Sequence, residues 1–138
     1  MDAVLAPDIY VNASVSLGSP PERVVRRALG GSVPAKTSNW VLERIESMLR
    51  ALPEFKDDAV AQQMRTIRGL VEVVETEEFY IEDWAEALCA LASAAGVKQV
   101  LTDHPDLLRD ENDRGIRFVS SDHWLDEQAT PPPPPPAS

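Results

Sequence analysis

Apolar residues along the chain recur mainly with helical spacing. In residues 38–52 they recur at intervals of three and four, which predicts an amphipathic helix that ends at Pro53. A similar stripe predicts a helix from residue 57 or 58 through Arg68. After "SPPE", the spacing of Ser19 and Glu22 matches a capping box, so a third helix begins there and stops at a pair of glycines.

Short apolar runs between these helices predict strands. "AVLAPDIYVNA" (residues 3–13) predicts a central first strand that runs up to Asp8 or just beyond, and "LVEVV" and "GIRFVS" predict two more. "IEDWAEALCALASAAGVKQVLT" predicts a helix, a stop at Gly96 and a strand, which together with "LVEVV" would form a βαβ unit. "SDHWLDEQ" predicts a last helical turn. Strands interleaved with helices predict an α/β domain with three layers, in which helices cover both faces of a central parallel sheet.

Composition narrows the class of protein. The chain has 138 residues, enough for one well-buried domain, which we assign to residues 1–128. Residues 129–138 contain six consecutive prolines and predict a disordered, solvated polyproline tail. The formal charge of −10 argues against general coating of nucleic acid. A single cysteine, Cys89, and the absence of a signal or membrane-length apolar run predict a cytoplasmic protein with no membrane partner.

Carboxylates follow the predicted strands. Asp8 ends the first strand, Asp83 starts the helix that leads into the "QVL" strand, and Asp103 follows that strand. Because parallel strands open into a crevice at their carboxyl ends, these side chains are expected to converge there. Carboxylates held together favour a hard cation such as Mg²⁺ or Mn²⁺, which can activate water. Helix capping by Asp83, with Glu86 as its reciprocal acid, is an equally good interpretation of that pair.

The other candidate motifs do not indicate a functional site. His104 has no second histidine or cysteine at a metal-ligand spacing, so a zinc site is not expected, and Asp106 fits a turn after Pro105. No phosphate-binding glycine pattern and no nucleophile elbow is present. The tryptophans stand near expected helix starts, where packing at the edge of the core is the ordinary explanation: Trp40, Trp84 and Trp124.

Two segments resemble the PIN-domain family. "VLAPDIYVNASVSLGSPPERVVRRAL" is similar to the opening of PIN domains, and "AEALCALASAAGVKQVLTDHPDLL" is similar to their later half. The resemblance implies a doubly wound α/β fold and an acidic pocket that holds Mg²⁺ or Mn²⁺ and cleaves RNA. It also implies toxin–antitoxin pairs and homodimers. Carried over, the metal ligands would be Asp8, Asp83 or Glu86, and Asp103, with Glu43 as the acid of the second helix.

The alignment to this family is shifted at three positions. Without gaps, the family's first aspartate falls on Ala6, the glutamate of the second helix on Arg44, and the aspartate after the "VLT" strand on His104. Two hypotheses follow. The chain is either a Mg²⁺- or Mn²⁺-dependent ribonuclease that uses Asp8, Asp83, Asp103 and Glu43, or a PIN-like domain without catalysis that binds a protein partner.

Overall fold

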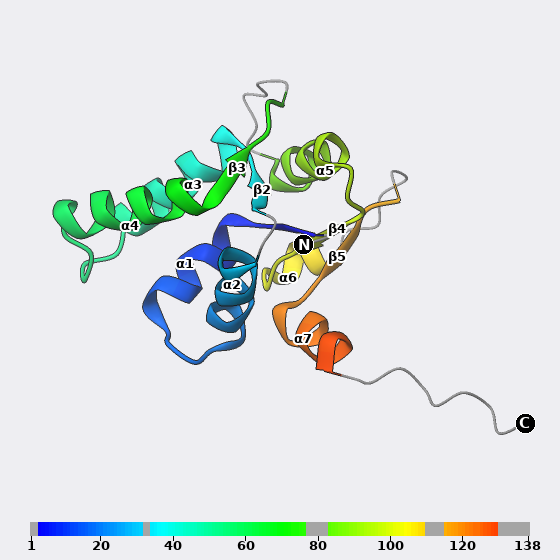
Figure 1. Ribbon diagram of the computed structural model, residues 1–138, viewed down its shortest axis with the longest axis horizontal. Helices are drawn as coiled ribbons and strands as arrows, with labels where there is room; N and C mark the ends of the chain where they lie inside the picture. Colours follow the sequence, from blue (N-terminus) through cyan, green and yellow to red (C-terminus); the bar gives the residue numbers. More distant parts are fainter. Residues whose placement is uncertain (1–2, 32–33, 77–82, 110–114, 130–138) are drawn as a thin grey trace, which may run out of the picture.

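The computed structural model describes residues 3–31, 34–76, 83–109 and 115–129. Within these ranges helices and short strands alternate along the chain (Figure 1). The strands are β1 (Val4–Leu5), β2 (Ala35–Thr37), β3 (Val71–Val73), β4 (Gln99–Leu101) and β5 (Arg117–Val119). The helices are α1 (Pro7–Val15), α2 (Pro20–Gly30), α3 (Asn39–Arg50), α4 (Asp57–Leu70), α5 (Trp84–Ala95), α6 (Pro105–Leu108) and α7 (Ser121–Ala129). The chain is therefore an α/β protein, as its pattern predicts.

The strands form two parallel sheets. One has the order β1-β4-β5, with Val4 opposite Val100 and Val100 opposite Phe118, and the other pairs β2 with β3. In Figure 1, α3, α4 and α5 lie above β1 and β4, whereas α2, α6 and α7 lie below them. Since β1, β4 and β5 are parallel, their carboxyl ends share one edge, and a helix begins shortly after each of them.

The predicted first strand is wrong beyond its first residues. The chain is extended only at β1 and through Ala6, and "PDIYVNASV" is helix α1. Pro7 at the start of the helix and an acid beside it favour a helix there. Burial of Ile9, Tyr10 and Val11 on several sides of α1 then outweighs their preference for strands.

Two further expectations about strands need correction. β2 was not predicted, because its sequence Ala-Lys-Thr contains no apolar run of the kind that marks the other strands. The expected βαβ unit through α5 does not form, because its two strands do not pair: β3 pairs with β2, and β4 pairs with β1. In the part of the chain that the structure describes, α5 therefore connects two separate sheets.

The remaining helices follow their local signals. Ser19 and Ser38 cap α2 and α3, accepting hydrogen bonds from Glu22 N–H (3.4 Å) and Val41 N–H (3.3 Å). Gly96 ends α5 in the left-handed conformation with φ 74°. The last helix, α7, is longer than the single turn expected and includes Ala129, the first residue of the predicted tail. Residues 130–138 lie outside the described ranges, so the expectation for the proline tail is not addressed.

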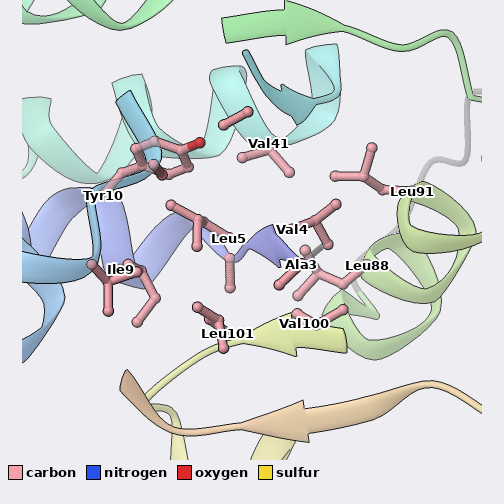
Figure 2. Close-up of a cluster of buried hydrophobic side chains, with 14 of the residues drawn as sticks. Ala3, Val4, Leu5, Ile9, Tyr10, Val41, Leu88, Leu91, Val100 and Leu101 are labelled. Carbon is pink, nitrogen blue, oxygen red and sulfur yellow. The ribbon is translucent and has the colours of Figure 1, made fainter. Parts of the chain in front are cut away.

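The core forms around β1 and β4 (Figure 2). Leu5, Ile9, Leu88, Val100 and Leu101 pack together with Val4 and are fully or almost fully buried. Removing such side chains from water is the main favourable term in folding. No helix in the described ranges is long and apolar enough to cross a membrane.

Candidate functional site

Asp8 and Asp103 meet at the carboxyl edge of the three-stranded sheet. Asp8 lies in the first turn of α1 and not at the end of a strand, as the sequence had suggested, but this turn directly follows β1. Its Oδ1 accepts the Thr102 hydroxyl at 2.9 Å, and its Oδ2 accepts the Asp103 backbone N–H at 2.8 Å. Asp8 is only 8 % exposed. The structure thus places the Asp8 carboxylate against the backbone of Asp103.

The Asp103 side chain faces the beginning of α7. Its Oδ1 accepts the backbone N–H of Ser121 at 2.8 Å, and its Oδ2 accepts the Ser121 hydroxyl at 2.7 Å. Ser120 completes this cap by accepting the His123 N–H at 3.2 Å. A carboxylate at a helix N-terminus is stabilised by the unpaired N–H groups and the helix dipole. Asp103 thus joins the end of β4 to α7.

Burial governs the protonation of Asp8. Loss of water around the carboxyl raises its pKa above the usual value of 3.8, and the nearby Asp103 charge raises it further. Hydrogen bonds from the Asp103 N–H and the Thr102 hydroxyl oppose these effects, but burial is the largest of them. Asp8 is therefore a carboxyl whose charged form is stabilised mainly by the backbone and by one hydroxyl.

Asp83 caps α5. Its side chain accepts the backbone N–H of Glu86 at 3.3 Å, and both residues are exposed to solvent. The capping interpretation of Asp83 is confirmed, and it accounts for the residue without a metal. Asp83 and Glu86 therefore belong to the start of α5, whereas Asp8 and Asp103 meet at the sheet edge.

Helix α3 presents Arg44, and not Glu43, to neighbouring side chains. Glu43 is exposed, whereas Arg44 is half-buried with its guanidinium carbon 5.4 Å from the centre of the Trp40 ring. This geometry is a cation–π contact. The buried face of α3 is formed by Val41, Leu42 and other apolar residues, which turns Glu43 toward water.

An aromatic cluster includes His104, the residue that follows Asp103. Trp40 and Trp84 contact edge to face, with ring centres 5.6 Å apart and planes at 86°, and the Trp84 ring centre lies 6.4 Å from that of His104. We call Arg44, Trp40, Trp84 and His104 the aromatic cluster. His104 also caps α6, because its Nδ1 accepts the Asp106 N–H at 3.2 Å. The cap belongs to His104, and Asp106 occupies the first turn.

The sequence did not identify the partners of the carboxylates. Thr102 and Ser121 are buried hydroxyl residues that follow β4 and β5. Their only sequence signal is that a small polar residue ends each apolar strand. Ser121 lies 18 positions from Asp103, so its role depends on the pairing of β4 with β5.

The donor set can be compared with what Mg²⁺ or Mn²⁺ requires. These cations prefer several oxygen ligands in octahedral geometry. All four oxygens of Asp8 and Asp103 already accept hydrogen bonds from protein groups. Within residues 3–31, 34–76, 83–109 and 115–129, no group of three or more histidines, cysteines or acids could hold a metal ion. The described side chains do not form a ready ligand set, and metal binding stays a prediction.

Comparison with known proteins gives no family assignment. Neither a family model nor a curated protein matches this chain.

Proposed function

We propose that the chain is a PIN-like three-layer α/β/α domain that acts as a protein-binding or scaffolding module, with its sheet-edge carboxylates used to hold the fold together. One observation carries this proposal. Each oxygen of Asp8 and Asp103 accepts a hydrogen bond from Thr102, Ser121 or the backbone of Asp103. These hydrogen bonds link the end of β4 to the first turn of α1 and to the start of α7. A cation could bind the two carboxylates only by replacing these hydrogen-bond donors.

Burial supports the same conclusion. Asp8 is almost inaccessible to solvent, so a cation could reach its carboxylate only if the surrounding groups moved. The neighbouring Asp103 is held by Ser121, so moving it would also release α7.

The aromatic cluster supplies a surface for a protein partner. Trp40 and Trp84 are half-buried, and Arg44 lies against one of them. Tryptophan and arginine are the residues most enriched among the energetically important positions of protein interfaces. The formal charge of −10 disfavours RNA over the surface as a whole and does not disfavour a neutral or basic protein.

Calorimetric titration of Mn²⁺ into the full chain tests this proposal. We expect no saturable binding to the wild-type chain and no difference in an Asp8→Asn, Asp103→Asn double variant. Asp122→Asn, at an exposed acid in the first turn of α7, is the matched control. Saturable binding that disappears only in the double variant, with its fold verified by circular dichroism, would refute the structural assignment of the carboxylates.

A metal-dependent ribonuclease is the second candidate, because two acids do lie side by side after β1 and β4. The Asp103 N–H bonds to Asp8 at 2.8 Å, so a cation could contact both side chains only if their present hydrogen bonds rearranged. Cleavage of a labelled single-stranded RNA in Mn²⁺, lost in the double variant, would favour this function. An antitoxin partner and a homodimer stay predictions that belong to this candidate, and light scattering measures the second directly.

A further inference from the structure

Strand β3 is an edge strand in the part of the chain that the structure describes. There it belongs to a sheet of two strands and pairs with β2 on one side (Figure 1). The Val74 N–H donates to the Thr37 carbonyl of β2 at 2.8 Å. Because successive backbone groups of a strand point to opposite sides, the N–H and the carbonyl of Val73 are directed away from β2. Such an edge is a template for one more strand.

Apolar side chains are exposed along this edge. Val73 of β3 is 43 % exposed, and Leu70, which directly precedes the strand, is 44 % exposed. Val71 and Val74 are half-buried. A strand added beside β3 would therefore cover apolar surface as well as pair with the outward backbone groups of Val73.

The charge of this edge selects the kind of strand that fits it. Glu72 and Glu75 are exposed, and the sequence "VEVVETEEFYIED" (residues 71–83) contains six acids and no lysine or arginine. Lys36 lies opposite Glu72 on β2, which is the other side of β3 from the free edge. Cross-strand pairs of opposite charge stabilise a sheet, and pairs of like charge destabilise it. A strand with basic residues opposite Glu72 and Glu75 is therefore favoured.

A second copy of this chain is a less favourable occupant. Its β3 carries the same two glutamates, and the formal charge of −10 on each chain makes two copies repel one another. Charged side chains on an edge strand are a means by which proteins prevent pairing between identical edges. The same charges attract a basic strand from a different protein.

We propose that the free edge of β3 binds an extended basic segment of another protein, which adds a third strand to the sheet of β2 and β3. An aliphatic residue of this segment lies opposite Val73, and lysine or arginine lies opposite Glu72 and Glu75. Backbone hydrogen bonds to Val73 hold the segment in place, and the two charge pairs select it. The residues of this edge differ from those of the aromatic cluster and of the Asp8–Asp103 pair, so the inference does not depend on the function proposed above.

Titration of the ¹⁵N-labelled full chain by NMR tests this proposal, with the acetylated and amidated peptide Val-Lys-Val-Val-Lys-Val as the probe. This sequence reads the same in both directions, so it fits β3 in parallel and in antiparallel orientation. We expect saturable shifts of the amide signals of residues 70–76 and slower hydrogen exchange at the Val73 amide. The peptide Val-Glu-Val-Val-Glu-Val should bind at least tenfold more weakly, and added salt should weaken the basic peptide.

One variant tests the backbone of the edge. Val73→Pro removes the outward N–H and leaves the Val74 N–H that pairs with β2, a position at which an edge strand accepts proline. It should weaken binding of the basic peptide at least tenfold. Val73→Thr keeps the N–H, is the matched control and should bind within threefold of wild type. If Val73→Pro does not fold, the peptide with N-methyl groups on its two central valines replaces it, with the same expected loss.

A second variant tests the charges. The double variant Glu72→Gln, Glu75→Gln should weaken the basic peptide at least fivefold, whereas Glu54→Gln, at an exposed acid between α3 and α4, should bind like wild type. Absence of saturable shifts, shifts centred outside residues 70–76, or equal binding of the acidic peptide would overturn the proposal. Dimerisation of the wild-type chain that is lost in Val73→Pro, measured by analytical ultracentrifugation, would also overturn it, because a second copy would then occupy the edge.

Discussion

Asp103 holds Ser121 by two hydrogen bonds, one to the backbone N–H at 2.8 Å and one to the hydroxyl at 2.7 Å. The pair joins the carboxyl end of β4 to the first residue of α7. It therefore caps the last described helix at its first residue, and Trp124 and Leu125 on that helix are buried.

Ser121→Ala removes the hydroxyl of this pair and leaves the backbone bond. We expect the free energy of unfolding to fall by about 1–2 kcal/mol, because a partly buried hydrogen bond to a carboxylate at a helix start is lost. Urea unfolding measures the change. Ser47→Ala, at an exposed position of α3, is the control and should stay within about 0.5 kcal/mol of wild type.

The raised pKa of Asp8 predicts a particular pH dependence of stability. Between the ordinary value of 3.8 and the higher pKa in the fold, the folded protein binds more protons at Asp8 than the unfolded chain does. The contribution of Asp8 to stability therefore falls as the pH rises through this interval, and above it a constant cost remains.

Asp8→Asn removes this titration. The free energy of unfolding of wild type minus that of Asp8→Asn should be largest at the acid end and should decrease as the pH is raised. Urea unfolding of both proteins at several values from pH 4 to pH 7 measures it. A difference that grows with pH would mean that hydrogen bonding, and not burial, dominates at Asp8.

Tyr10→Phe is expected to stabilise the protein. The Tyr10 hydroxyl is buried, has no partner in the described part of the chain, and burial raises its pKa far above the usual value of 10.0. Its removal relieves the desolvation of an unpaired polar group, which is worth about 1 kcal/mol. Thermal unfolding should show a higher Tm. A fall in Tm would instead indicate that the hydroxyl has a partner in solution.

Two glycine substitutions should act in opposite directions. Gly96 has φ 74° at the end of α5, so Gly96→Ala is expected to destabilise the protein by about 1 kcal/mol. Gly69 is the penultimate residue of α4, and an added Cβ would meet nothing within 4 Å. Gly69→Ala should therefore stabilise by up to about 1 kcal/mol. Equal effects in urea unfolding would contradict the role assigned to the backbone at Gly96.

The elements that were predicted correctly are those with local signals. Helix α2 begins at the Ser19 cap, α3 carries its apolar stripe from Val41 to Leu49, and α5 stops at Gly96. Helix α1 could not be predicted in this way, because "DIYVNA" favours a strand locally and becomes helical only when tertiary packing surrounds it. β2 exists because Ala35 and its neighbours pair with β3, a contact that lies more than thirty residues away.

In the candidate site too, some features could be predicted from the sequence and others depend on tertiary packing. The sequence places Asp8 and Asp103 near the same sheet edge, because the carboxyl ends of parallel strands share that edge whatever the packing of individual side chains. Their partners could not, since Ser121 reaches Asp103 only after β5 has paired with β4. The exposure of Glu43 depends on the rotation of α3, which is set by the packing of Val41 and Leu42 against the core.

The pairing of β1 with β4 also determines when the three-stranded sheet can form during synthesis. Val4 pairs with Val100, and Ala6 N–H donates to the Leu101 carbonyl at 2.9 Å. During synthesis the first strand therefore has no partner until about a hundred residues have followed it, and pairings so distant in sequence slow folding. A fragment that stops before β4 would expose the apolar residues of β1, so we expect the N-terminal half alone to be a substrate for chaperones and proteases and not a folded unit.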